Sequence, residues 1–191
     1  MRNRNKIIDT MNVFRSVLTS LMSGRNNVII GGSAALVLHG LDIGRELMDV
    51  DIIIYKPTAE QDTLLNLLMN FDYIKAEHSP RRAMKLKKDG FFIDIIMERN
   101  SDQPMPTDFL LIEISGIAYK IQSVKKVVEA KCSYTLEGRS QEPTLYTRRK
   151  DVFDLQLLKN LNFNFEAELV KEIQNQVNRP LADTSRGPGN S

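Results

Sequence analysis

Residues 28–55 read VIIGGSAALVLHGLDIGRELMDVDIIIY, and this stretch decides the fold. It opens with the short apolar run 28–30, which is typical of a buried strand. Residues 31–33, Gly-Gly-Ser, follow, and residues 34–39 then have helical character. After a polar connection that contains glycine, the stretch closes with a second strand ending at Tyr55. Strands that alternate with helices in this way favour an α/β fold.

Two acidic residues, Asp49 and Asp51, belong to the second of these strands. Because strand side chains alternate between faces, both carboxylates project from one face, while Val50 and Ile52 project from the other. Two carboxylates this close repel each other, and they stay ionised most easily when a cation lies between them. Hard oxygen ligands of this kind suit Mg2+. The spacing therefore indicates a candidate metal site at Asp49 and Asp51.

The turn formed by Gly31, Gly32 and Ser33 is a candidate phosphate cradle. A strand-to-helix turn offers backbone N–H groups and a helix N-terminus to an anion, and glycine lets the backbone approach closely. The alternative is an ordinary turn between a strand and a helix. The sequence contains neither a P-loop lysine motif nor a G-x-G-x-x-G run, which disfavours the two common rival nucleotide-binding folds.

A third acid, Asp94, lies in the middle of the apolar run 91–97. Burying a charge without a partner costs roughly several kcal/mol, so this position calls for a partner. Lys88-Asp89-Gly90 reads as a hairpin turn that leads into the run. We expect the strand with Asp94 to lie beside Asp49 and Asp51, which would complete a cluster of three carboxylates. The alternative is an acid at a strand end that points into solvent.

The order of these motifs resembles the signature of the nucleotidyltransferase superfamily related to DNA polymerase beta. The matching residues are Gly-Gly-Ser at 31–33 and Asp-Val-Asp at 49–51, and the likeness is greatest to small bacterial members, the antibiotic and toxin–antitoxin nucleotidyltransferases. Arg45 stands four residues before the first aspartate, as in many of those members, whereas Leu47 replaces a frequent threonine. The resemblance covers roughly residues 25–160 and implies a short mixed sheet covered by helices, with a helical C-terminal part.

The resemblance also implies an activity, in which an acceptor hydroxyl attacks the α-phosphorus of a nucleoside triphosphate (NTP) and pyrophosphate leaves. Two Mg2+ ions would stabilise the attacking and leaving oxygens. Asp49, Asp51 and Asp94 would be the catalytic residues and the metal ligands, and Asp94 would also accept the proton of the acceptor. The residues implied for nucleotide binding are Gly31, Gly32, Ser33, Arg45 and Lys131.

For several basic residues the sequence allows two roles, one in ligand binding and one that is only structural or solubilising. Arg45 either contacts phosphate or is a solvated loop residue, and Lys85 and Lys87 either line the cleft or only make a strand surface soluble. Lys131 lies on a predicted helix at 124–134. We expect it to join an internal ion-pair network with charged residues at the start of the next helix, and a nucleotide contact is the alternative. Those charged residues are Arg148, Lys150, Asp151 and Asp154.

Length and composition are those of a globular enzyme-sized domain. The 191 residues suit a single domain over 1–178, with a core at about 25–122 and a helical part at about 123–178, and we expect a disordered tail at 179–191. The net charge of +2 gives no reason to expect extended duplex DNA as a partner. The single cysteine, Cys132, fits a reducing cytoplasm. No apolar run approaches the ~20 residues that a membrane-spanning helix needs, so we expect no membrane partner.

Hydrophobic periodicity predicts the remaining elements. Helices are expected at 6–23, from 57 to about 70, at 124–134, at 148–161 and at about 164–177. Strands are expected at 83–87, 91–97, 109–114 and 116–121, and loops at 100–108 and 135–146.

The sequence therefore predicts a Mg2+-dependent nucleotidyltransferase of the cytoplasm, in a toxin–antitoxin or resistance context. Its substrates would be an NTP and an acceptor hydroxyl on a small molecule, a protein or an RNA end. One alternative is a catalytically inactive binding module that keeps the fold, which the presence of all three carboxylates argues against. Another is an enzyme that modifies RNA or tRNA ends, for which the local clusters at Lys85–Lys88 and Arg148–Lys150 would supply the charge.

Overall fold

A computed structural model describes the chain over residues 2–68, 75–79, 83–99, 105–133, 154–158 and 170–171. The chain divides into two compact units, Met1–Val124 and Lys125–Ser191. This boundary lies next to residue 123, where the sequence predicts the change from the sheet core to the helical part, and the single domain predicted over 1–178 stays a prediction.

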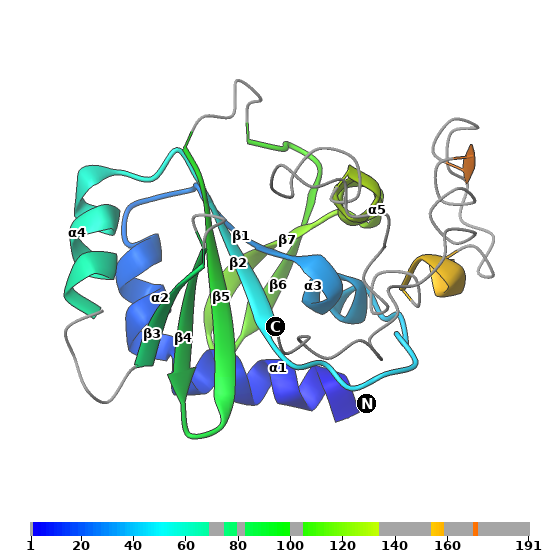
Figure 1. The fold of residues 1–191 in the computed structure, drawn as a ribbon, viewed down its shortest axis with the longest axis horizontal. Coiled ribbons are helices and arrows are strands. Elements are labelled where there is room, and N and C mark those ends of the chain that lie inside the picture. The colour runs from blue at the N-terminus through cyan, green and yellow to red at the C-terminus, as the bar shows by residue number, and fades with distance from the viewer. Residues whose placement is uncertain are drawn as a thin grey trace, which may run out of the picture. The chain divides into compact units, whose positions relative to one another are not determined.

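The first unit is built on one mixed sheet of seven strands in the order β3-β4-β5-β2-β1-β7-β6 (Figure 1). β1 pairs with β7 and β2 pairs with β5 in parallel, and the other neighbours are antiparallel. The predicted mixed α/β architecture is therefore confirmed. The strands are β1 (Val28–Gly31), β2 (Val50–Tyr55), β3 (Lys75–Ser79), β4 (Ala83–Lys88), β5 (Phe91–Glu98), β6 (Phe109–Ile114) and β7 (Ile117–Gln122).

One face of the sheet packs against the hydrophobic core, and the other face is partly exposed and includes polar side chains. Along β2 the buried residues alternate with half-buried ones, so that Val50, Ile52 and Ile54 lie in the core while Asp51 and Ile53 face the other way. Figure 1 shows the helices α1 (Arg2–Val13) and α2 (Arg15–Met22) behind the sheet. Their buried side chains are Ile7, Thr10, Met11, Leu18 and Leu21. The alternation therefore places Asp51 on the face opposite the main hydrophobic core.

The segment predicted as one helix over 6–23 forms two helices that meet at Phe14. Phe14 has φ −99° and ψ 13°, which lies outside the helical region. The Thr10 hydroxyl donates a hydrogen bond of 2.7 Å to the carbonyl of Lys6, one turn earlier. Threonine side chains that bond back to the preceding turn often bend helices, which accounts for a break that hydrophobic spacing does not reveal.

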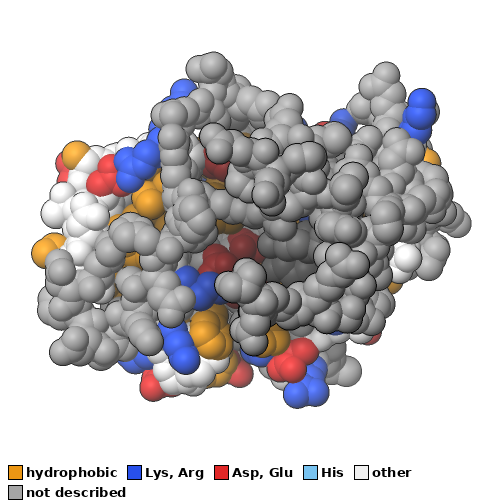
Figure 2. Space-filling view, viewed as in Figure 1, with side chains coloured by type: hydrophobic (Ala, Val, Ile, Leu, Met, Phe, Trp, Pro, Cys, Tyr) orange, Lys and Arg blue, Asp and Glu red, His pale blue; other side chains and the backbone are white. Residues whose placement is uncertain are grey.

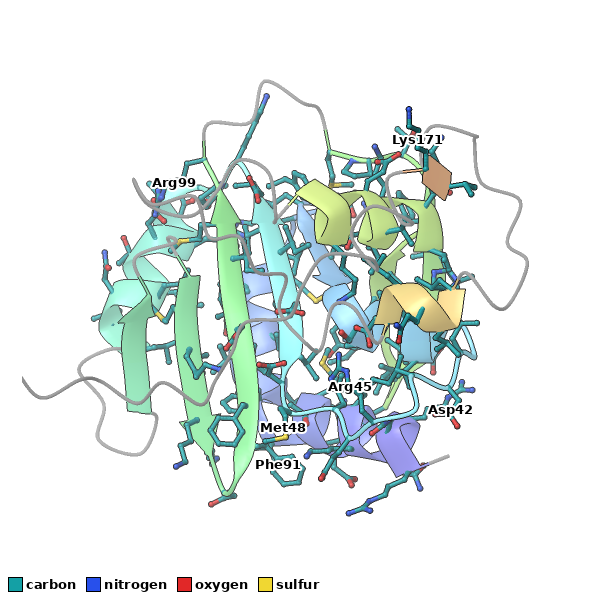
Figure 3. All side chains as sticks on the ribbon, turned by 45° about the vertical axis from the view of Figure 1, so that its right-hand side comes forward. Asp42, Arg45, Met48, Phe91, Arg99 and Lys171 are labelled. Carbon is teal, nitrogen blue, oxygen red and sulfur yellow. The ribbon has the colours of Figure 1, made fainter. Side chains whose placement is uncertain are left out.

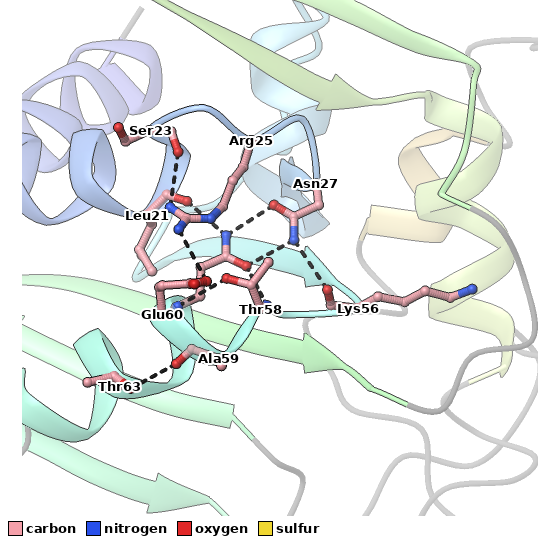
Figure 4. Close-up of polar contacts among 10 residues, drawn as sticks. Leu21, Ser23, Arg25, Asn27, Lys56, Thr58, Ala59, Glu60 and Thr63 are labelled. Carbon is pink, nitrogen blue, oxygen red and sulfur yellow. Dashed lines mark hydrogen bonds and ion pairs between the residues drawn. The ribbon is translucent and has the colours of Figure 1, made fainter.

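Helix α4 (Ala59–Leu68) starts with a capping box, Thr58-x-x-Gln61 (Figure 4). The N–H of Gln61 donates to the Thr58 hydroxyl at 3.3 Å, and the N–H of Thr58 donates to the Gln61 side-chain oxygen at 3.0 Å. The buried Gln61 amide also donates to the carbonyl of Leu21 at 2.8 Å and exchanges hydrogen bonds with Asn27. This network ties the start of α4 to the end of α2 and the entry to β1.

β4 and β5 form the predicted hairpin through Asp89-Gly90. Asp89 has φ 50° and Gly90 has φ 81°, the two positive angles that a two-residue turn of type I′ requires. The turn fixes the register, so that Lys88 pairs with Phe91 and Lys85 pairs with Asp94. β3 was not predicted, because the sequence of 75–79, KAEHS, has no apolar alternation.

The described part of the second unit is helical. α5 (Val124–Ser133) lies within the helix predicted at 124–134, and Val127 and Val128 are buried, as predicted. Residues 154–158 are helical and lie inside the helix predicted at 148–161. The loop predicted at 135–146, most of the helices predicted at 148–161 and 164–177, and the tail at 179–191 lie outside the described residues. Among the described residues, no helix combines the length and the apolar character needed to cross a membrane.

Candidate active site

The turn between β1 and α3 (Gly32–Leu38) requires glycine at position 32. Gly32 has φ +59°, in the left-handed region that L side chains rarely adopt. A Cβ at this position would also lie 2.8 Å from Cγ of Asp51. The backbone of the turn therefore lies directly against the Asp51 carboxylate. The Gly-Gly-Ser turn and the Asp-Val-Asp motif, which the sequence predicts separately, are therefore adjacent in the structure.

Arg45 reaches the same turn from the connection between α3 and β2 (Figure 3). Its guanidinium donates a hydrogen bond of 2.7 Å to the hydroxyl of Ser33, which is buried. The side-chain amide of Asn3 donates to the Arg45 carbonyl at 2.8 Å, and its oxygen accepts from the N–H of Leu47 at 3.0 Å. Arg45 is therefore half-buried and held beside the candidate cradle, and its contact with phosphate stays a prediction.

Three residues lie in one row across neighbouring strands of the sheet. Asp51 on β2 is the register partner of Gly31 on β1 and also of Asp94 on β5. Neighbouring strands are about 4.8 Å apart, so residues in register on one face are in reach of each other. Asp49 comes two residues before Asp51 and therefore shares its face. The expected approach of Asp94 to the two other aspartates is confirmed by this register.

Lys85 on β4 extends the row by one strand, because it is the register partner of Asp94. Its Nζ lies 2.9 Å from Oδ1 of Asp94 and 3.6 Å from Oδ2 of Asp49. The side chains of Asp49 and Asp94 are 19% and 24% exposed, so these ion pairs are partly shielded from solvent. Figure 2 shows acidic side chains beside a basic one near the middle of the face in view.

The charges of the aspartates act on Lys85. Partial burial by itself would lower the pKa of Lys85, but the hydrogen bond and charge of Asp94, together with the charge of Asp49, outweigh this and raise it above its usual value. Lys85 is therefore a firmly protonated cation within the carboxylate group.

The sequence left Lys85 undecided between lining the cleft and making the surface soluble. A strand in which lysines alternate with apolar residues is usually a solvent-facing strand. The signal that could have placed it is the hairpin, because a two-residue turn at Asp89-Gly90 puts position 85 opposite position 94. Lys87 has the solvent-facing position that is usual for such a lysine, since it is exposed. Its Nζ lies 5.4 Å from the centre of the Phe92 ring.

The carboxylates fit one hard cation bound together with a phosphate group. Within the described residues, no group of three or more His, Cys, Asp or Glu side chains is arranged to hold a metal ion. Mg2+, however, needs only one or two carboxylates when phosphate oxygens and water complete its coordination. Asp51 lies against the Gly32 turn and Asp49 comes two residues before it, so these two carboxylates are available to such an ion. Lys85 lies nearer to Asp94 than to Asp49. The chemistry of this donor set therefore suits a Mg–triphosphate complex.

Lys131 belongs to the second unit and is paired there. Its Nζ lies 2.8 Å from Oδ2 of Asp154, and the two side chains are 7% and 0% exposed. The expected ion pair between the helix with Lys131 and the charged start of the next helix is therefore present. The other members expected in that network, Arg148, Lys150 and Asp151, lie outside the described residues. A nucleotide contact from Lys131 stays a prediction.

Gly32→Ala should cost both stability and ligand affinity. We expect a loss of about 1–2 kcal/mol in the free energy of unfolding, because the alanine must adopt a left-handed backbone. Affinity for a Mg–NTP complex should fall as well, since the new Cβ displaces the Asp51 carboxylate. Denaturant unfolding and calorimetric titration measure the two effects.

Gly116→Ala is the matched control for this substitution. Gly116 also has positive φ, at +78°, but a Cβ there would meet no atom of the described residues within 4 Å. It should lose a similar amount of stability and keep full affinity for the nucleotide. Equal affinities of the Gly32→Ala variant and the wild type would show that the nucleotide does not use this turn.

Comparison with known proteins supports the fold but gives no family by sequence. No family model matches the chain, and no curated protein matches its sequence. A Helicobacter pylori protein assigned as a nucleotidyltransferase superimposes with a TM-score of 0.53 at 16% identity, over 88% of this chain and 75% of that one. The antibiotic-resistance factor ANT(2'')-Ia superimposes with a TM-score of 0.52 at 14% identity, over 87% and 90% of the two chains. The chain therefore has the nucleotidyltransferase fold, as the Gly-Gly-Ser turn and the paired aspartates predict.

Proposed function

We propose that this protein is a Mg2+-dependent nucleotidyltransferase, which moves a nucleoside monophosphate from an NTP to an acceptor hydroxyl and releases pyrophosphate. The observation that carries the proposal is the row formed by Gly31, Asp51 and Asp94 on three neighbouring strands, with Asp49 on the same face. The candidate phosphate cradle and the carboxylates are thereby brought together. The fold shared with nucleotidyltransferases supports the same conclusion.

The turn would bind the triphosphate. Gly31, Gly32 and Ser33 would hold its β- and γ-phosphates through backbone N–H groups, which need no side chain in the way. Arg45 would add a positive charge, since its hydrogen bond to Ser33 holds the guanidinium beside the turn. Mg2+ held by Asp49 and Asp51 would neutralise part of the charge on the phosphates.

The transfer step forms one bond and breaks one. The acceptor oxygen bonds to the α-phosphorus, the bond from that phosphorus to the bridging oxygen breaks, and pyrophosphate leaves with the electron pair. Asp94 would take the proton of the acceptor hydroxyl on a carboxylate oxygen. Its half-buried place beside Asp51 in the register gives it access to the group that reacts. Positioning and charge neutralisation supply most of the rate in such chemistry.

The acceptor class is a hydroxyl on a small molecule, a protein or an RNA end. Because an antibiotic-resistance factor has the same fold, a small-molecule acceptor in a resistance setting is tested beside the toxin–antitoxin setting. Incubation with each radiolabelled NTP, Mg2+ and cell extract, followed by separation of the protein, RNA and small-molecule fractions, identifies the class from the fraction that takes up label.

Asp94→Asn tests the catalytic assignment. Pyrophosphate release in the presence of extract should fall by about 100-fold or more, the lower end for a positioned general base, while affinity for Mg–NTP changes little. Asp89→Asn is the control, because it makes the same chemical change at the turn of the same hairpin, where asparagine is equally suited to positive φ.

Two outcomes would contradict the proposal in different ways. Equal release rates for the Asp94→Asn variant and the wild type would remove Asp94 from the catalytic residues. An absence of release by the wild type across all extracts, despite tight NTP binding, would indicate a binding module with this fold.

A further inference from the structure

Lys85 contacts two carboxylates, whereas a lysine on a strand surface usually extends into solvent. Its own strand, β4, is the neighbour of β5 and not of β2. Its ammonium group nevertheless reaches past β5 to within 3.6 Å of Asp49, the residue before β2, while it lies 2.9 Å from Asp94 on β5. One cation therefore contacts carboxylates from two separate segments of the chain. Between two such carboxylates, a cation relieves the repulsion that otherwise separates them.

Lys85 and one divalent cation together balance the three carboxylates, while Arg45 and the backbone N–H groups of the turn would face the charge of the triphosphate. Asp49, Asp51 and Asp94 carry three negative charges when ionised, and the ammonium group of Lys85 balances one of them. A single divalent cation balances the remaining two. A second divalent cation would need Asp94, the carboxylate that the first ion leaves unused, and would have to displace the ammonium group that lies 2.9 Å from it.

We propose that the ammonium group of Lys85 takes the place of the second metal ion of two-metal transfer, so that the site binds a single divalent cation with the NTP. The inference rests on the proposed function and replaces the two Mg2+ ions expected from the resemblance. The Mg2+ ion at Asp49 and Asp51 accompanies the triphosphate. Because the ammonium group lies beside Asp94, the proposed proton acceptor, it would stabilise negative charge that develops on the acceptor oxygen during transfer.

Lys87 provides the matched comparison within the same strand. It lies two residues on, so it shares the face of Lys85, and the Nζ atoms of the two lysines lie 5.8 Å and 5.4 Å from the centre of the Phe92 ring. The two side chains thus have the same charge, strand, face and aromatic neighbour. They differ in that Lys85 contacts Asp49 and Asp94.

The experiment counts Mn2+ ions bound in the presence of a saturating NTP analogue whose α–β bridge cannot be cleaved. Calorimetry or electron paramagnetic resonance gives the number of Mn2+ ions per bound nucleotide. We expect one ion for the wild type and for Lys87→Met. Lys85→Met should bind two, because Asp49 and Asp94 then face each other across a position without a cation. Lys85→Arg, which keeps the charge, should stay at one.

Each alternative result overturns a distinct claim. Two Mn2+ ions bound by the wild type would overturn the inference and leave the proposed function intact, since Lys85 would then be displaced by a metal ion. A single ion in a folded Lys85→Met variant would overturn it as well. If the wild type bound the analogue without any Mn2+, both the inference and the Mg2+-dependent function would be wrong. The wild-type count decides the question even if the variants fail to fold.

Discussion

Replacing Asp49 and Asp51 together by asparagine should lower nucleotidyl transfer by at least about 10³-fold, because both carboxylates that would hold the Mg–triphosphate are lost. Affinity for Mg–NTP should fall in parallel. The protein should stay folded, with a free energy of unfolding within about 1 kcal/mol of the wild type. The change removes the ion pair of Asp49 with Lys85 at 3.6 Å, but it also removes repulsion between like charges.

Asp42→Asn is the control for this double substitution. Asp42 is an exposed carboxylate on the connection between α3 and β2, and its side chain accepts a hydrogen bond of 3.0 Å from the N–H of Gly44 (Figure 3). Asparagine can accept the same hydrogen bond, so transfer should be unchanged. Unchanged Mg–NTP affinity in a folded Asp49→Asn, Asp51→Asn variant, measured by calorimetric titration, would refute the assignment of the metal site.

Lys131→Met should reduce the free energy of unfolding by about 3–5 kcal/mol, because it leaves the fully buried Asp154 carboxylate without this cationic partner. Replacing both members, Lys131→Met with Asp154→Leu, should restore much of the loss, since a buried ion pair and a well-packed apolar pair are often similar in stability. Urea unfolding of the two single variants and the double variant measures the coupling between the residues.

Lys126→Met is the control on the same helix. Its Nζ lies 2.6 Å from Oε2 of Glu129, but the two side chains are 41% and 34% exposed, so the loss should be no more than about 0.5 kcal/mol. An equally small effect of Lys131→Met would contradict the structural role of the Lys131–Asp154 pair. If the folded double variant bound NTP as tightly as the wild type, Lys131 would not be a nucleotide contact.

The three aspartates could be predicted because each stands in, or directly before, a strand that is otherwise a run of apolar residues. Asp49 and Asp51 interrupt an apolar strand two residues apart, which fixes their common face without any knowledge of tertiary structure. Asp94 interrupts another such strand, and burial cost alone indicates a partner for it. The glycine at position 32 was predicted for closeness to phosphate, and the structure adds a second reason, its closeness to Asp51.

Other features depend on register and on local hydrogen bonds, which composition does not show. Lys85 looks like any solvent-facing lysine until the hairpin turn places it opposite Asp94. β3 contains a single apolar residue, Ala76, because it is an edge strand, so it lacks the pattern that reveals a buried strand. The break at Phe14 follows a hydrogen bond from Thr10, not a change in hydrophobic spacing.

Transfer of label from two differently labelled forms of one NTP tests the central claim most directly. The wild type is incubated with Mg2+, cell extract and NTP that carries phosphorus-32 at either the α or the γ position. Nucleotidyl transfer predicts that the α label appears in an acceptor, that the γ label is released as pyrophosphate, and that the Asp49→Asn, Asp51→Asn variant does neither. Transfer of the γ label to the acceptor, or α label transfer that survives in this variant, would contradict the account.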